Sequence, residues 1–151
     1  MGPADQMSNL NINSNSDSTT LSVPKLHDDG SNWADYYPRI ERALGSKGLW
    51  RHVLGTATAP KPYTMLSGVP VIADGKTPAT EEQIESKETR IQEYERREYL
   101  AQHVVLSTTS TRLGAKLKHL KTAKEMWDVV KTDVTTKSSL FLLDAEESRT
   151  N

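Results

Sequence analysis

The chain is 151 residues long, which is enough for one domain or for one domain with a tail, and its formal charge at pH 7 is −1. This near-neutral balance does not point to nucleic acid or to an anionic membrane. The sequence contains no cysteine, which excludes disulfides, thiol catalysis, cysteine-ligated zinc and iron–sulfur clusters.

Residues 1–23 are predicted to form a disordered polar tail. Residues 5–22 are mainly Asp, Gln, Asn, Ser and Thr, with few aliphatic residues and no aromatic one. Such a segment buries too little apolar surface to offset the conformational entropy that it would lose on ordering. Residues 24–151 are therefore assigned to one folded domain.

The start of the chain shows no targeting signal. The first 24 residues contain no Lys or Arg, which fits neither a secretory signal nor an Arg-rich transit peptide. No apolar run approaches the roughly 20 residues that are needed to cross a bilayer. We therefore expect a soluble cytoplasmic protein without a membrane partner.

A first helix is predicted to follow a turn at residues 28–32. Asn32 is a good N-cap, but a helix that starts there places Pro38 in its interior, where proline removes a hydrogen bond. With Asp35 as N-cap, Pro38 falls in the first turn, where its N–H is not needed. We favour Asp35. The residues at helical spacing that would bury one face are Tyr36 or Tyr37, Ile40, Ala43 and Leu44.

A second, short helix is predicted over residues 49–54, closed by Gly55. The next segment, residues 55–79, contains four prolines and is predicted to be a long connection. Within it a small β-hairpin is expected, because β-branched residues precede an Asp-Gly turn signal. These residues are Val69, Val71 and Ile72, followed by Asp74-Gly75.

A long charged helix should come next. Thr80 and Gln83 form a capping-box pattern, and acidic and basic residues interleave from Glu81 to Glu98. The apolar stripe is thin at first and thickens from Leu100 onward. We therefore expect the front half of this helix to project into solvent and the back half to enter the core.

Three further helical segments complete the predicted fold. One lies near residues 110–120, with Leu113, Leu117 and Leu120 facing inward. A second opens at a capping box of Thr122 and Glu125, and the third covers residues 138–149. The fold class is thus all-α, a bundle of about five helices.

No constellation of residues indicates catalysis. The four histidines, His27, His52, His103 and His119, have no cysteine beside them and no second histidine at i,i+4, so they do not indicate a metal site. The hydroxyl-rich residues 107–111 lack a nucleophile elbow and are expected to end one helix and cap the next. We predict no catalytic, cofactor-binding or metal-binding residue, no small-molecule substrate, and no enzymatic activity.

A strip of cations offers a second interpretation. Arg112, Lys116, Lys118, Lys121 and Lys124 fall within thirteen residues that contain no acid. On a helix face such residues can contact RNA phosphates, and the binding would weaken as salt rises. The alternative is a solvated helix face balanced by the acidic segment before it. We favour the solvated helix face over RNA contact, because the sequence shows no exposed aromatic platform for bases.

The large aromatic residues are predicted to act as core anchors, that is, as bulky side chains buried between helices. Trp50 and Trp127 lie among aliphatic residues at helical spacing, which favours a core position over a ligand cage. The predicted core anchors are Trp33, Tyr36, Leu49, Trp50 and Trp127.

The same residues belong to two blocks with a recognisable order. The first block contains a Leu, a Gly-Ser-Asn turn, two aromatic residues and a Leu-Trp pair, and the second is an Ala-x-Glu-x-Trp helix followed by a Leu-rich helix. Over roughly residues 23–147, this ordered set resembles the N-terminal part of the Gag polyprotein of copia-type LTR retrotransposons, especially fungal ones. The matching residues are Leu26, Gly30, Ser31, Asn32, Trp33, Tyr36, Leu49, Trp50, Ala123, Glu125, Trp127 and 140–146.

The chain departs from the family in one respect, because Trp33 stands where Tyr is usual and Tyr36 stands where Trp is usual. The resemblance implies a helical domain similar to the N-terminal domain of a capsid protein. It also implies a structural role, in which copies of the chain associate into virus-like particles that package RNA.

The sequence lacks the zinc knuckle and the protease motif of that family, and also the second half of the capsid region. We therefore expect the helical domain to be truncated at its C-terminus. Two alternatives remain open. One is an RNA-binding module that uses the strip from Arg112 to Lys124, and the other is a domesticated Gag-derived domain that binds another protein.

Overall fold

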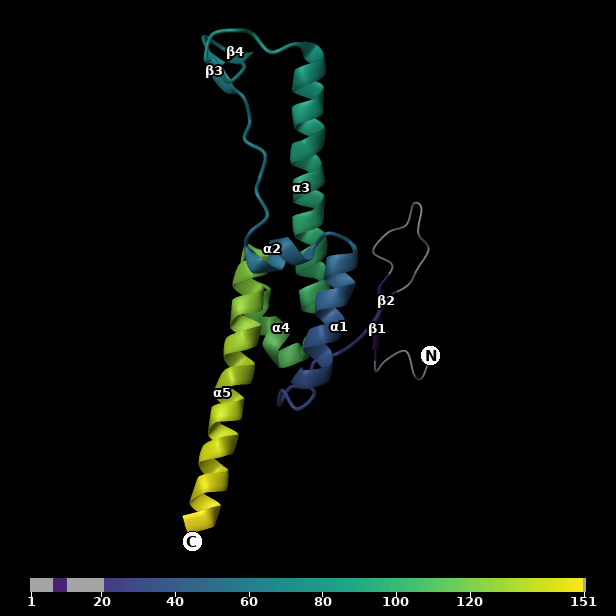
Figure 1. The fold of residues 1–151 in the computed structure, drawn as a ribbon, viewed down its shortest axis with the longest axis vertical. Coiled ribbons are helices and arrows are strands. Elements are labelled where there is room, and N and C mark those ends of the chain that lie inside the picture. The colour runs from purple at the N-terminus through teal and green to yellow at the C-terminus, as the bar shows by residue number, and fades with distance from the viewer. Residues whose placement is uncertain (1–6, 11–20, 151) are drawn as a thin grey trace. The chain divides into compact units, whose positions relative to one another are not determined.

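The computed structural model describes the backbone of residues 7–10 and 21–150 and the side chains of residues 23–137. Over this part the fold is mainly helical, which confirms the predicted all-α class with five helices (Figure 1). The helices are α1 (Trp33–Ser46), α2 (Trp50–Leu54), α3 (Glu81–Ser107), α4 (Thr111–Leu117) and α5 (Ala123–Thr150). The four short strands are β1 (Met7–Leu10), β2 (Leu21–Pro24), β3 (Thr64–Leu66) and β4 (Val69–Val71).

The chain divides into two compact units. The first comprises Met1–Thr56 together with Glu98–Asn151, and the second comprises Ala57–Arg97. The domain predicted for residues 24–151 therefore contains the whole of the second unit and part of the first.

The N-terminal segment contains one strand pair. β1 and β2 are antiparallel, with Met7 opposite Pro24. Val23, which the sequence prediction assigned to the disordered tail, is buried in the core. Residues 1–6 and 11–20, which make up most of the predicted tail, lie outside the described residues.

The core of the first unit is built from one face of each helix that contributes to it. The inward positions predicted for Ile40, Leu113 and Leu117 are confirmed, because all three side chains are buried. The core cluster comprises Val23, Leu26, Tyr36, Ile40, Ala43, Leu44, Leu49, Val53, Ala101, Val104, Val105, Leu113, Leu117, Ala123, Met126, Trp127, Val130 and Val134.

The predicted N-cap at Asp35 is wrong. Asn32 occupies the N-cap position of α1, and its carbonyl accepts the N–H of Tyr36 at 2.8 Å. The Asn32 side chain does not cap the helix, because it is used in the preceding loop, where its Oδ1 accepts the N–H of His27 at 2.7 Å. Pro38 therefore lies inside α1, at the cost of one helical hydrogen bond.

The starts of α3 and α4 follow the predicted capping patterns. At α5 the Glu125 N–H donates to Thr122 Oγ1 as predicted, but the Glu125 carboxylate accepts the N–H of Lys121 and not that of Thr122. At α3 the Thr80 N–H donates to the Gln83 side chain at 2.8 Å, and the Gln83 N–H donates to Thr80 Oγ1 at 3.1 Å, so both halves of the capping box form. Ser110 caps α4, since its Oγ accepts the N–H of Leu113. The separate helix predicted for residues 138–149 is not present as such, because α5 runs without a break to Thr150.

The hairpin predicted within residues 55–79 is confirmed, but its turn lies elsewhere. β3 and β4 are joined by Ser67 and Gly68, both with positive φ (51° and 81°), as a tight hairpin turn requires. The predicted turn at Asp74-Gly75 is a second one. There the Asp74 carboxylate accepts the N–H groups of Lys76 and Thr77, at 2.9 and 2.8 Å.

Candidate functional site

Five aromatic rings meet in the first unit, and Trp127 of α5 lies at their centre. Its ring centroid is 5.6 Å from that of Trp33 and 5.6 Å from that of Trp50. The rings of Tyr37 and Tyr36 lie at 6.0 and 6.3 Å. Trp33 is stacked on Trp127, whereas Trp50 meets it edge to face, and both are favourable arrangements. We call these five residues the aromatic cluster.

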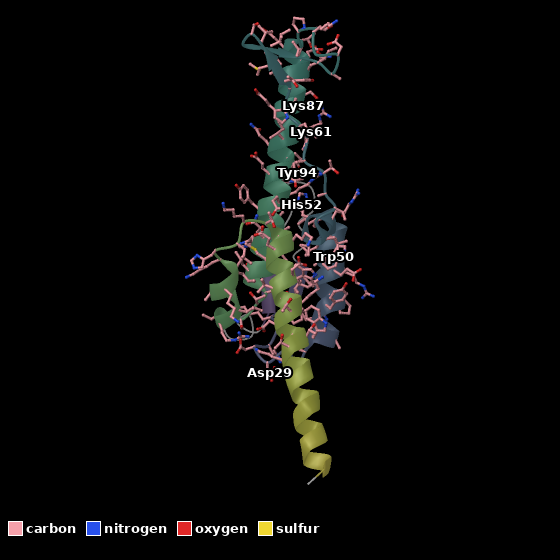
Figure 2. All side chains as sticks on the ribbon, turned by 90° about the vertical axis from the view of Figure 1, so that its left-hand side faces the viewer. Asp29, Trp50, His52, Lys61, Lys87 and Tyr94 are labelled. Carbon is pink, nitrogen blue, oxygen red and sulfur yellow. The ribbon has the colours of Figure 1, made fainter. Side chains whose placement is uncertain are left out.

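The predicted core anchors differ in how deeply they are buried. Tyr36, Leu49 and Trp127 are at most 1% exposed. Trp33 and Trp50 are only partly buried against the core, and they are the first residues of α1 and α2. The three most buried residues thus behave as predicted, while two indole rings also reach the surface. Figure 2 labels Trp50 on α2.

A buried polar chain runs beside the aromatic cluster. The Tyr36 hydroxyl lies 2.7 Å from Thr108 Oγ1. The Thr108 hydroxyl in turn donates to the carbonyl of Val104 at 2.8 Å. The Thr108 carbonyl accepts the N–H of Leu26 at 2.7 Å. Burial raises the pKa of the Tyr36 hydroxyl well above its usual range, and the bond to Thr108 offsets only part of this rise. These groups are satisfied and enclosed, which is a structural arrangement rather than a reactive one.

A second polar group of residues joins three helices of the first unit around Glu98. One carboxylate oxygen lies 3.2 Å from His52 Nδ1. The other oxygen accepts the side-chain amide of Gln102 at 2.7 Å and the N–H of Ala123 at 2.8 Å. Glu98 therefore caps the start of α5 while it contacts α2. Sequence analysis missed this group, because its members are separated by 25 and 46 residues.

The arrangement of His52 and Glu98 can be compared with that of a catalytic pair. His52 is 5% exposed, and both oxygens of Glu98 already accept hydrogen bonds or pair with His52. An acid–base pair needs access to a substrate proton, and here the His52 ring faces the Glu98 carboxylate, which also accepts the N–H of Ala123 at the start of α5. The geometry accounts for a helix junction, and Figure 2 labels His52 on α2.

Three of the five cations in the predicted RNA-binding strip are paired with carboxylates. Arg112 Nε lies 2.7 Å from Asp28 Oδ1, and its Nη2 lies 2.9 Å from Asp133 Oδ2. Lys116 lies 3.9 Å from Asp133. Lys124 pairs with Asp128 of α5 at 2.7 Å, so much of the positive charge is neutralised locally.

These cations lower the pKa values of the carboxylates with which they pair. Hydrogen bonds from Ser110 and Arg112 lower the pKa of Asp28. Burial alone would raise the pKa of Asp133, but Arg112 and Lys137 outweigh burial and lower it. The other two strip residues, Lys118 and Lys121, are exposed. The structure thus does not bring the five predicted cations together as one unpaired basic surface.

A shallow groove of about 350 Å³ lies between α4 and α5. Its lining is mainly hydroxyl and charged side chains, namely Lys116, Asp128, Val129, Thr132, Asp133 and Thr136.

Within the described part of the chain, no group of three or more His, Asp or Glu is placed to hold a metal ion. None of the described helices combines the length and the apolar character needed to cross a membrane.

No protein-family model, no curated protein and no solved structure matches this chain. The likeness to copia-type Gag therefore rests on the residues that carry it.

Proposed function

We propose that this chain is a structural protein of the Gag capsid type, which acts by associating with copies of itself into particles that enclose RNA. It needs no reactive side chain for this role, because such subunits work through the faces of rigid helices. The functional parts are the helix surfaces, and the core anchors hold these surfaces in place.

One observation supports the proposal most directly. The two blocks that carry the resemblance are far apart in the sequence, yet their aromatic residues meet in the aromatic cluster. Trp33 and Trp50 from the first block both contact Trp127 from the second, each at 5.6 Å. Residues that a family pattern retains for packing should meet in this way, whereas residues that share a pattern by coincidence need not.

The ion pairs weigh against the RNA-binding module as the main function. A phosphate that contacts Arg112 or Lys116 must compete with Asp28 and Asp133. RNA contact through Lys118 and Lys121 remains a secondary role, and it fits a subunit that encloses RNA. The domesticated interaction domain is the third candidate, and no contact within the described residues favours it.

The proposal is tested by electron microscopy of the purified full chain, with and without RNA. We expect discrete assemblies that become more numerous when RNA is added. Charge reversal of Lys118 and Lys121 should remove the effect of RNA and leave protein-only association intact. Tight RNA binding by a chain that forms no assembly would favour the RNA-binding module. Incorporation into particles of a full-length Gag without assembly alone would favour the interaction domain.

A further inference from the structure

The β3–β4 hairpin of the second unit has one covered edge and one open edge. On the β4 side, Val71 forms an antiparallel bridge with Pro78, and the N–H of Ala79 donates to the carbonyl of Pro70 at 2.9 Å. On the β3 side, no strand described by the structure pairs with it. β3 is therefore an edge strand, and edge strands present main-chain groups to which another chain can bind.

The register of the hairpin shows which main-chain groups point outward. In a hairpin with a two-residue turn, the two residues that flank the turn exchange main-chain hydrogen bonds. Here the turn is Ser67–Gly68 and the flanking pair is Leu66 and Val69. Such pairs alternate along antiparallel strands, so Met65, opposite Pro70, turns its N–H and C=O away from β4. Pro70 fits this pattern, because it has no N–H and its carbonyl accepts a bond from outside the hairpin.

The hairpin also carries an apolar surface with no charged side chain of its own, and Lys87 of α3 lies 4.7 Å from the centroid of the Tyr63 ring at its edge. Met65 is 59% exposed, Leu66 50% and Val69 45%. No Asp, Glu, Lys or Arg lies between Tyr63 and Val71, whereas edge strands are commonly protected by charged side chains. Figure 1 shows this hairpin beside the start of α3, within the same compact unit.

We propose that β3 pairs with β3 of a second copy of this chain, antiparallel about a two-fold axis at Met65. The two Met65 residues exchange both N–H···O bonds, and Tyr63 lies opposite Ser67 of the second copy. Pro62 on one side and the turn on the other confine pairing to residues 63–67, a stretch that is symmetric about Met65. The edge is thus its own complement, as a two-fold contact requires.

This pairing rests on the proposed function and specifies one of its contacts. A strand of three residues makes a weak contact alone, but such contacts add up when each subunit of an assembly makes several. A second copy also suits this surface better than RNA does, because the exposed side chains of Met65, Leu66 and Val69 are apolar and offer no charge to a phosphate.

The test is sedimentation of the full chain with substitutions at position 65. Met65→Pro removes only the outward donor, as Pro70 already does on the opposite strand, and Met65→Lys places a charge on the edge. Met65→Leu is the matched control. We expect wild type and Met65→Leu to associate reversibly. We expect Met65→Pro and Met65→Lys to need at least about tenfold higher concentration, because each weakens the paired edge.

A crosslinking experiment measures the same contact in a second way. The chain has no cysteine, so Met65→Cys introduces a single thiol. A hydrogen-bonded antiparallel pair holds its Cα atoms about 5.5 Å apart, within the range of a disulfide. Met65→Cys should therefore oxidise to a covalent dimer faster than Tyr99→Cys, whose parent side chain is 68% exposed.

The possible outcomes separate this inference from the proposed function. If Met65→Pro and Met65→Lys associate like wild type, or if the two thiols crosslink at equal rates, edge pairing is wrong while self-association stands. A wild-type chain that remains monomeric at every concentration overturns both. If Met65→Pro fails to fold, the lysine variant and the thiol still decide the result.

Discussion

The hydroxyl of Tyr36 in α1 is hydrogen-bonded at 2.7 Å to Oγ1 of Thr108, the residue that immediately follows α3. The two residues are 72 positions apart, and both are fully buried. Because Thr108 also accepts the N–H of Leu26 through its carbonyl, this contact connects α1, α3 and the segment that follows β2. It therefore depends on three parts of the chain and should be sensitive to their packing.

Tyr36→Phe should destabilise the protein by about 1 kcal/mol, because it removes one buried hydrogen bond and retains the ring. Chemical denaturation measures this change, and Tyr37→Phe, in a ring that is only partly buried, should have little effect.

The raised pKa of Tyr36 also makes the free energy of unfolding depend on pH. In the unfolded chain the hydroxyl ionises near pH 10, so the stability from this group is present below about pH 10 and lost above it. Equal alkaline sensitivity of wild type and Tyr36→Phe would contradict this account.

Trp127→Ala should cost about 3–5 kcal/mol, because it removes the ring at the centre of the aromatic cluster and leaves a cavity. Trp50→Ala should cost clearly less, since that side chain is only partly buried. Thermal and denaturant unfolding of both variants measures the difference. Equal losses, or no loss for Trp127→Ala, would show that the cluster does not organise the core.

Glu98→Gln should destabilise the first unit by about 2 kcal/mol, because hydrogen bonds to a charged acceptor are stronger than those to an amide. The substitution affects the contacts with His52, Gln102 and the start of α5 together. Glu95→Gln, an exposed site three residues earlier, is the matched control. Hydrogen exchange should show faster opening at the first turn of α5 only in Glu98→Gln. Unchanged exchange at that turn would rule out the capping role.

Asp133→Asn should weaken the acid sensitivity of folding. The pKa of Asp133 is lower in the folded chain than in the unfolded one. Its contribution to stability is therefore present above the unfolded value of about 3.9 and is lost as pH falls through the folded value. Unfolding free energies at a series of pH values below 5 measure this slope. Asp35→Asn, at an exposed partner of Arg39, serves as control, and identical slopes for wild type and Asp133→Asn would refute the prediction.

Local signals predicted the structure well where the interaction is local. Thr80 and Gln83 are three residues apart, and their reciprocal bonds depend on little beyond the helix itself. Pro38 misled the prediction of the α1 start, because its presence favoured a start at Asp35. The helix begins after Asn32 instead and tolerates Pro38 in its interior.

Long-range contacts show where sequence reasoning ends. The tryptophans were predicted to be core residues from their apolar neighbours, but the meeting of Trp33 and Trp50 at Trp127 depends on how three helices pack. The group around Glu98 had no signal at all, because a charged residue on a charged helix looks solvated until α2 and α5 meet it. Arg112 was predicted to be a solvated cation or, in the alternative, a contact for RNA, and its pairing was missed because Asp28 and Asp133 lie 84 and 21 residues away.

Self-association is the central claim, and the molar mass of the purified chain in solution tests it most directly. Light scattering should be measured over a wide range of concentrations, at low and high salt. The account predicts a mass that rises above the 16.8 kDa of a single chain as concentration increases, at either salt. A mass that stays at the single-chain value throughout, with and without RNA, would contradict it.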